Sequence, residues 1–403
     1  MGRGVRKVIG FFFSAPGRTW RISLGLAGLA LLLGCALNAG LAGRPHDPGP
    51  FAPTSFAPSA RPRPSIAPSD LQAELEARVA AYGEPVGVAV SDVDAGWIVQ
   101  VAGDEAFPQQ SVSKLWVALT LLDGVDRGLF RLSDPVTMGA ADRSVFFQPV
   151  VGSYGPDGYA TTLDELLRRA LIESDNAAAD RLVRYVGGAA AIQATLQQKG
   201  LRGILAGGEE RDLQSKIAGL DSWQESYGQG NNFKAARARL SPAARDVALA
   251  AYLDDPPDGA QPRAVAAALA ALKRGELLRP GSTALLLSLM TQATTGPLRL
   301  KGGLPLGWTL AHKTGTGQDW RDASVGINDV GLMTAPDGRA YAIAVMIRRT
   351  AKPVPDRLAF MQGVASAVVR HWELHTSGWA QAPSLGPPAP TSLPEQGRLR
   401  WAR

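Results

Sequence analysis

The pattern of apolar and polar positions predicts a folded region from about residue 70 to residue 376 of the 403-residue chain. At its start, apolar residues fall on one helical face, and Gly83 is expected to end that helix. The residues of this face are Leu71, Leu75, Val79 and Ala80. Strand-like runs follow at 86–90 and 97–101, and the turn-forming residues between them indicate that the two strands are joined by a tight turn.

The middle of the folded region is predicted to be mostly helical, and strands return near its end. Helical segments are expected at 115–122, 163–172, 176–185, 242–253, 264–272 and 283–289. Strand-like runs then occur at 309–311, 325–332 and 341–347, before a last helix over about 356–374. Because strands lie at both ends, we expect the two ends to build one sheet and the middle to form a separate helical lobe. A cleft between lobes is the default place for a site.

The ends of the chain follow no such pattern. Residues 1–21 carry five basic and no acidic side chains, and residues 22–43 are almost entirely apolar. We therefore predict an export segment over 1–43, and three forms of it stay open. It is a cleaved signal peptide, an uncleaved membrane anchor, or a lipoprotein signal in which Leu32-Leu33-Gly34 before Cys35 resembles a lipobox. Each form places the protein outside the cytoplasm, in the periplasm or attached to the envelope membrane.

Charge and cysteine content narrow the classes of function. The formal net charge is +6, but residues 1–70 carry eight basic and two acidic side chains, and the tail from residue 378 carries three basic and one acidic. The folded region is therefore near −2, which argues against a nucleic-acid-binding surface. Cys35 is the only cysteine, so neither an intramolecular disulfide nor a catalytic thiol is expected in the folded region.

The first candidate chemical motif is Ser111-Val112-Ser113-Lys114. Residues three apart share a helical face, so Lys114 would lie beside Ser111. A serine hydroxyl needs a base to become a nucleophile, and a lysine with a lowered pKa can serve as one. The helix N-terminus would also favour a developing oxyanion. By itself this motif is weak, because a helix cap has the same residues.

Two further motifs follow in order. Ser174-Asp175-Asn176 lies between two predicted helices, where these residue types also serve as ordinary N-caps. Lys313-Thr314-Gly315-Thr316 follows a strand-like run. A cation and hydroxyls at that position can hold a substrate carboxylate, and glycine lets a substrate lie along the strand. The alternative for this motif is a plain hairpin edge.

The three motifs in this order resemble the signature of penicillin-recognising serine enzymes, and the chain resembles class A β-lactamases over about residues 70–375. The segments 295–300, 304–308 and 328–331 also resemble that family. The resemblance implies a two-lobed α/β fold, an antiparallel sheet flanked by helices plus an all-α lobe. The composition of the two ends and the resemblance together divide the chain into the following parts: the export segment 1–43, a Pro-rich linker 44–69, a catalytic domain 70–377 and a disordered tail 378–403. Within the domain, the α/β lobe would comprise 70–107 and 300–377, and the helical lobe 108–299.

The resemblance also implies the roles of individual residues in a monomeric enzyme acting on small β-lactams. Ser111 would be the nucleophile, Lys114 and Glu210 bases, and Ser174 a proton shuttle. The backbone amides of Ser111 and Thr316 would form the oxyanion hole. Substrate would be bound by the following residues: Asn176, Lys313, Thr314, Gly315, Thr316, Arg299 and Phe147. For Arg299 a plain surface position, and for Phe147 packing within a loop, stay open as alternatives.

Glu210 distinguishes a β-lactamase from related peptidases, because this family uses a glutamate to activate the deacylating water. It lies 34 residues after Asn176 in Glu210-Arg211-Asp212-Leu213-Gln214, where Gln214 replaces the family's asparagine. A polar surface turn is the alternative for this charged run. The segment 215–261 is longer than usual in the family and is expected to remodel the mouth of the site.

Two rival functions share the motifs: a D-Ala-D-Ala carboxypeptidase or transpeptidase, and a non-catalytic lactam or peptidoglycan sensor. Both would keep a long-lived acyl-enzyme. No metal or organic cofactor is expected. His371 and His375 are four residues apart with Glu373 between them, but the order is not His-Glu-x-x-His and the sequence offers no further ligand set.

Overall fold

The computed structural model describes residues 65–376. The predicted export segment with Cys35, nearly all of the linker, and the predicted tail lie outside the described residues. Within 65–376, no helix is both long and apolar enough to cross a membrane. The predicted start of the folded region agrees with the first helix, α1 (Ser69–Tyr82), which ends where Gly83 adopts a left-handed conformation.

The centre of the fold is an antiparallel sheet of six strands in the order β2-β1-β10-β9-β7, with β8 paired to β9. The strands are β1 (Val86–Asp92), β2 (Ile98–Val101), β7 (Thr309–Gly315), β8 (Asp319–Trp320), β9 (Ala323–Thr334) and β10 (Ala340–Thr350). Strand β1 pairs directly with β10, so that Val88 lies opposite Val345. The prediction that the two ends of the chain build one sheet is therefore confirmed.

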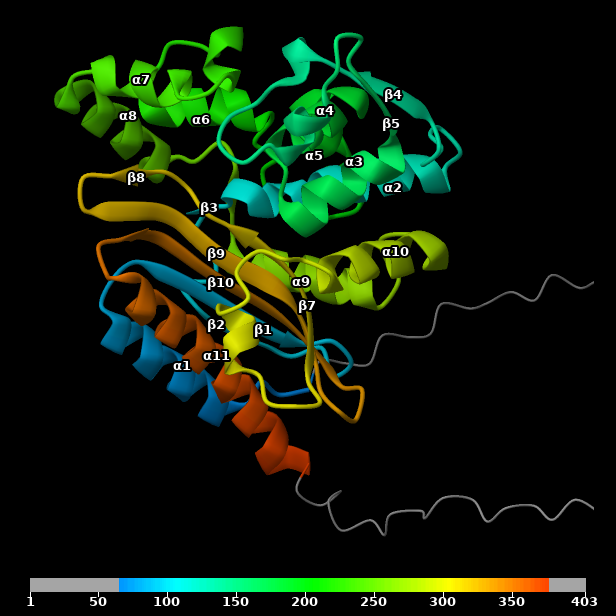
Figure 1. The fold of residues 1–403 in the computed structure, drawn as a ribbon. Coiled ribbons are helices and arrows are strands. Elements are labelled where there is room, and N and C mark those ends of the chain that lie inside the picture. The colour runs from blue at the N-terminus through cyan, green and yellow to red at the C-terminus, as the bar shows by residue number, and fades with distance from the viewer. Residues whose placement is uncertain (1–64, 377–403) are drawn as a thin grey trace, which may run out of the picture. The chain divides into compact units, whose positions relative to one another are not determined.

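The two faces of the sheet bury different side chains. In β10, Ile343, Val345 and Ile347 pack into a core with α1 and α11 (Val354–Thr376), whereas Ala342 and Ala344 join the core of the other face. Helix α9 (Pro262–Lys273) packs on that second face, against β1 and β10 (Figure 1). The sequence placed α9 within the helical lobe 108–299. Its contacts instead place it on the sheet, where the small alanines of β10 leave room for a close helix.

The helical lobe surrounds α2 (Lys114–Asp126), whose residues are nearly all buried because other helices cover it on every side (Figure 1). The other helices that precede β7 are α3 (Leu163–Arg168), α4 (Asn176–Tyr185), α5 (Gly188–Gln198), α6 (Glu210–Ala218), α7 (Asn232–Arg239), α8 (Pro242–Asp254) and α10 (Pro280–Thr291), of which α10 also packs against β7. Two small strand pairs complete the fold: β3 (Phe107–Pro108) with β6 (Gly259–Ala260), and β4 (Pro135–Met138) with β5 (Tyr159–Thr162). The sequence pattern did not predict α5, α6, α7 or these short strands.

The pairing of β3 with β6 holds the turn that precedes Ser111. Gln110 has a φ of 53°, a left-handed conformation that costs energy for a residue with a side chain. Its backbone N–H donates to Asp258 Oδ2 at 2.7 Å, and its side-chain amide donates to the Tyr252 hydroxyl. That hydroxyl in turn donates to the Asp258 carboxyl at 3.0 and 3.2 Å. This buried network keeps the strained turn in place.

The network makes a prediction about stability and pH. Burial raises the pKa of Asp258 to about 7 from its ordinary 3.8, although the hydrogen bond from Gln110 opposes the rise. The folded chain therefore keeps this proton while the unfolded chain releases it, so stability is lost as pH rises from about 4 through 7. Asp258→Asn is uncharged at every pH, as the protonated acid is, and its carbonyl oxygen can still accept from the Gln110 N–H. Its NH₂ cannot accept from the Tyr252 hydroxyl, and this loss lowers the stability equally at every pH. We expect the variant to lose about 1 kcal/mol less stability per pH unit in this range.

Urea denaturation at pH 5, 6, 7 and 8 would measure this difference. A residual pH dependence is expected in the variant, because burial also raises the pKa of Asp180 to about 7. Equal slopes for the wild type and Asp258→Asn would show that Asp258 does not retain its proton in the folded chain.

Candidate active site

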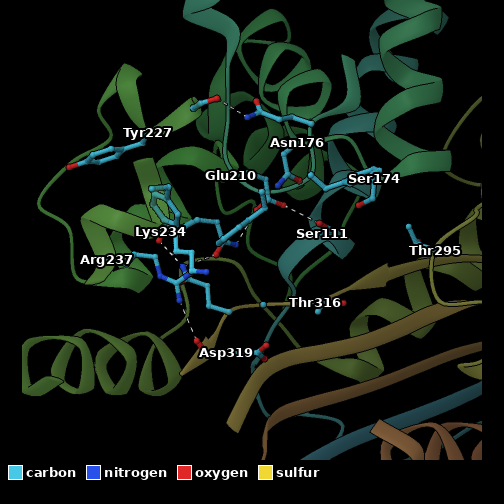
Figure 2. A pocket seen from close by; sticks show the side chains of 18 of the residues that line it. Ser111, Ser174, Asn176, Glu210, Tyr227, Lys234, Arg237, Thr295, Thr316 and Asp319 are labelled. Atoms are coloured by element: carbon cyan, nitrogen blue, oxygen red, sulfur yellow. Dashed lines mark hydrogen bonds between the residues drawn. The ribbon is translucent and has the colours of Figure 1, made fainter. Parts of the chain in front are cut away.

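The three sequence motifs meet at one cavity of about 1080 Å³. Ser111 lies in the helical turn Gln110–Ser113 that leads into α2, the second motif precedes α4, and the third ends β7. The predicted site residues that line the cavity are Ser111, Phe147, Ser174, Asn176, Glu210, Arg299, Thr314 and Thr316. Figure 2 shows several of them gathered around Ser111. Lys114 and Lys313 are buried behind this surface and reach it through their ammonium groups.

Lys114 is positioned to act on Ser111. Its Nζ lies 3.0 Å from Ser111 Oγ and donates to the backbone carbonyl of Ser174 at 2.9 Å and to Asn176 Oδ1 at 2.5 Å. The side chain is only 2% exposed, and this burial lowers its pKa against the opposing charge of Glu210. With two hydrogens held by these acceptors, loss of the third leaves a lone pair facing Ser111 Oγ. The geometry therefore suits a base.

Ser174 lies between the two lysines. Its backbone has a φ of 64°, and its Oγ receives hydrogen bonds from Lys313 Nζ at 2.9 Å and from Lys114 Nζ at 3.3 Å. Burial, and then the charge of Lys114, lower the pKa of Lys313 well below its usual range. A hydroxyl that contacts two ammonium groups of lowered pKa can pass a proton onward, because it can accept one and donate another.

Glu210 is the first residue of α6 and is buried, which excludes the surface-turn alternative. Its Oε1 accepts from Ser111 Oγ at 3.3 Å and lies 3.7 Å from Lys114 Nζ. Its Oε2 accepts from the amide of Gln214 at 3.2 Å. The same Gln214 amide donates to Gln110 at 2.7 Å, and Gln318 donates to the Gln214 carbonyl groups. The longer amide of Gln214 is thus held on three sides.

Asp180 fixes the backbone of Glu210, and the sequence analysis did not identify it. Its carboxyl oxygens accept from the backbone N–H groups of Glu210, at 2.6 Å, and of Arg211, at 3.2 Å. These are orphan donors of the first turn of α6, so Asp180 acts as a cap supplied by a neighbouring helix. Ser144 Oγ donates to it at 2.6 Å. The spacing in the sequence could have indicated Asp180, because this residue lies one helical turn after Asn176 and so shares a helical face with it.

The end of β7 forms the opposite side of the cavity. Arg299 donates to Thr316 Oγ1 at 2.6 Å and to the carbonyl of Gly315 at 2.9 Å. Arg299 is half-buried and lines the cavity, so it does not lie on the open surface. Thr295, which the sequence analysis did not single out as a site residue, pairs its hydroxyl with that of Thr314 at 2.7 Å. Hydroxyl and guanidinium groups at one strand end suit an anionic ligand group.

The predicted remodelling of the mouth by residues 215–261 agrees with the cavity lining. Phe147 is 57% exposed on the cavity, as expected for an aromatic wall, and the adjacent Phe146 packs edge-to-face on Phe233 of α7. Lys234 and Arg237 of α7 also line the cavity, across from Ser174 (Figure 2). Burial and the charge of Arg245 lower the pKa of Arg237 to about 10, so it stays cationic at neutral pH. Within residues 65–376, neither cation forms an ion pair with a carboxylate.

Known proteins resemble this chain throughout the described region. A family model described as the beta-lactamase enzyme family matches residues 70–372. The extended-spectrum β-lactamase PER-1 of Pseudomonas aeruginosa is 29% identical over 296 residues, which are 73% of this chain and 85% of that protein. A β-lactamase of Streptomyces albus G is 28% identical over 293 residues, 72% of this chain and 79% of that protein.

Solved structures show the same fold. A β-lactamase from Chitinophaga pinensis has a TM-score of 0.61 and 25% identity, covering 75% of this chain and 99% of its own. An ancestral class A β-lactamase has a TM-score of 0.58 and 30% identity, with coverage of 75% and 99%. The two-lobed α/β fold and the family resemblance inferred from the three motifs are confirmed. The chain belongs to the beta-lactamase enzyme family, as a class A serine hydrolase.

Proposed function

We propose that this chain hydrolyses the amide bond of β-lactams through an acyl-enzyme on Ser111, with Glu210 activating the water that releases it. The observation that carries the proposal is the position of Glu210. Its carboxylate is buried within 3.3 Å of the Ser111 hydroxyl, where a deacylating base must act. A peptidase or a sensor needs no such group, which is why β-lactamase activity is favoured over both rivals.

Acylation begins when Ser111 Oγ attacks the lactam carbonyl carbon. The hydroxyl proton passes to Lys114 or Glu210, whose atoms lie 3.0 and 3.3 Å from Oγ. The backbone amides of Ser111 and Thr316 hold the negative carbonyl oxygen of the tetrahedral intermediate. As the carbon–nitrogen bond breaks, the lactam nitrogen takes a proton from Ser174 Oγ. The lysine contacts of Ser174 then restore that proton.

Deacylation uses one water molecule. Glu210 removes a proton from the water, whose oxygen attacks the ester carbonyl, and Ser111 Oγ leaves with a returned proton. The Gln214 amide orients the Glu210 carboxylate through its 3.2 Å hydrogen bond. Asp180 fixes the position of Glu210 by accepting a hydrogen bond from the Glu210 backbone N–H.

Substrate is bound between the β7 edge and the loop that carries Phe147. We propose that the carboxylate of the β-lactam substrate binds to the following residues: Thr314, Thr316, Lys313 and Arg299. The amide group in the side chain of the substrate would bind to Asn176 and to the strand edge at Gly315. One N–H of the Asn176 amide donates to the Val145 carbonyl at 2.9 Å, which leaves the other for substrate. The α7 cations Lys234 and Arg237 favour substrates with acidic groups, because positive side chains that line a cavity attract anions.

Location and assembly belong to the same proposal. The basic and apolar residues 1–43 support export to the periplasm or attachment to the envelope membrane, and Cys35 is the candidate lipid acceptor. We further propose that the catalytic domain acts as a monomer, since the residues assigned to the reaction all come from one chain.

Removal of the base should separate the two half-reactions. In Glu210→Gln we expect acylation to continue and turnover to fall on the order of 10²- to 10⁴-fold, because the water loses its base. Intact-protein mass spectrometry after mixing with a chromogenic cephalosporin would then show one adduct per chain. Ser111→Ala should form no adduct. Asp212→Asn, an exposed acid on the same helical turn, is the control and should turn over normally.

Product released per enzyme decides between the functions. Many turnovers by the wild type support the β-lactamase. A plateau at one equivalent would contradict the role of Glu210 and favour the peptidase or sensor. Unchanged turnover in Glu210→Gln would leave β-lactam hydrolysis in place but would contradict the role of Glu210.

Arg299 provides a test of carboxylate binding. We expect Arg299→Ala to lower kcat/KM about ten- to a hundredfold, mainly through KM, because a charge-assisted hydrogen bond is lost. Arg299 also holds backbone carbonyls of β7 and β9, so a structural effect must be separated from a binding effect. Kinetics with a cephalosporin and with its carboxylate methyl ester make this separation. Equal losses on both substrates would show that Arg299 acts only on structure.

A further inference from the structure

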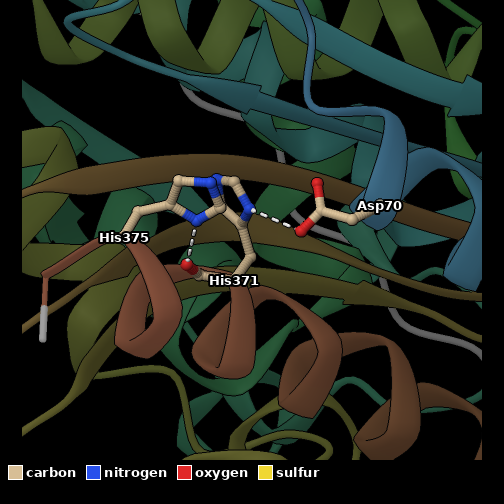
Figure 3. A group of neighbouring side chains, drawn as sticks. All are labelled: Asp70, His371 and His375. Atoms are coloured by element: carbon tan, nitrogen blue, oxygen red, sulfur yellow. Dashed lines mark hydrogen bonds and ion pairs between the residues drawn. The ribbon is translucent and has the colours of Figure 1, made fainter.

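A second cluster of chemically active side chains lies between α1 and α11, on the sheet face away from α9 and α2. It consists of Asp70 from the first turn of α1 and His371 and His375 from the last two turns of α11 (Figure 3). The two helices pack against each other over the sheet. The cluster therefore joins the first and last helices of the described region.

The donor atoms of the three side chains converge. One ligand atom from each lies within 4.8 Å of the other two, and His371 Nδ1 is 3.8 Å from Asp70 Oδ2. That separation is too long for a hydrogen bond. Two ligand atoms on a tetrahedral ion at the usual bond lengths lie about 3.3 Å apart. Small rotations of the exposed Asp70 and His375 side chains would close the difference.

The imidazole of His371 is buried, and one of its nitrogen atoms has no hydrogen-bond partner among the described residues. The residue is 7% exposed, and its Nδ1 has no hydrogen-bond partner among the described residues. A buried polar atom without a partner costs about 1–3 kcal/mol. The ring is held by edge-to-face packing on Trp97 at 5.3 Å and Tyr341 at 6.4 Å, so it has little freedom to turn toward water. An ion bound at Nδ1 would satisfy this atom.

His375 is oriented in the way that metal ligands usually are. Its Nδ1 lies 2.8 Å from the backbone carbonyl of His371, which can only accept a hydrogen bond, so Nδ1 carries the proton. The other nitrogen, Nε2, therefore keeps its lone pair available. A histidine that donates one N–H to a carbonyl and offers the other nitrogen is the common arrangement in metal sites.

We propose that Asp70, His371 and His375 bind a divalent transition metal, zinc in particular, with water as the fourth ligand. Two imidazoles and one carboxylate with an open position are a donor set that zinc accepts. The ion would tie α1 to α11 and stabilise the sheet face that these helices cover. The sequence pattern of His371 and His375 lacked a third ligand, because Asp70 is 301 residues distant from His371 and reaches it only through the packing of the two helices.

The test is zinc binding to the purified, untagged full chain. After chelator treatment and dialysis, isothermal titration with zinc sulfate should show one site per chain, and zinc should raise the melting temperature by several degrees. His375→Gln and Asp70→Asn each remove one ligand at an exposed position. We expect each variant to bind zinc at least tenfold more weakly and to lose the zinc-dependent rise, while its melting temperature without zinc stays near that of the wild type.

Asp356→Asn is the matched control, because it removes an exposed carboxylate from the first turn of α11, at the other end of the helix from the cluster, and should bind zinc like the wild type. Zinc binding that is absent in the wild type, or unchanged in both ligand variants, would overturn the proposal. β-Lactam turnover should be the same with and without chelator. A loss of turnover on chelation would place the ion at the Ser111 cavity and would also overturn it.

Discussion

The ammonium group of Lys114 is almost completely removed from water, and its partners come from three segments of the chain. They are Ser111 in the turn before α2, Ser174 and Asn176 at the start of α4, and Glu210 at the start of α6. A buried charge is tolerated only when it is paired and hydrogen-bonded. The same contacts that make this charge tolerable bring together Ser111, Ser174 and Glu210, which are the proposed nucleophile, proton shuttle and deacylating base. The contacts that stabilise the buried Lys114 charge therefore also assemble the residues of the proposed reaction.

Around Lys114, other buried contacts fix the backbone positions of the site residues and do not themselves touch the substrate. Asp258 and Tyr252 hold the strained turn at Gln110, and Asp180 holds the first turn of α6. Both carboxyl groups have raised pKa values near neutrality because they are buried. The site therefore depends on protonation equilibria at positions that touch no substrate, and its pH response need not reflect catalytic groups alone.

Much of the fold could be predicted from periodicity because its helices and strands show their buried faces in the sequence. Helix α4 agrees with its predicted bounds, and the pairing of β1 with β10 followed from strands lying at both ends. Ser111, Ser174 and Lys313 could be found from the sequence because each belongs to a short motif whose residues are close together along the chain. The features that could not be predicted depend on contacts between residues far apart in the sequence. Asp180 and Asp258 act on residues 30 and 148 positions away, and α9 was assigned to the wrong layer because a helix pattern does not show what it packs against.

The connection between β1 and β10 also has a consequence for the order of events during synthesis. Val88 pairs with Val345, so the central strands of the sheet come from positions more than 250 residues apart. Such high contact order delays folding, since loop closure over that length must precede the contacts that reward it. While the ribosome is still making the middle of the chain, β1 can pair with β2 but not with β10. The central sheet can therefore be completed only after β10, close to the end of the folded region, has been made.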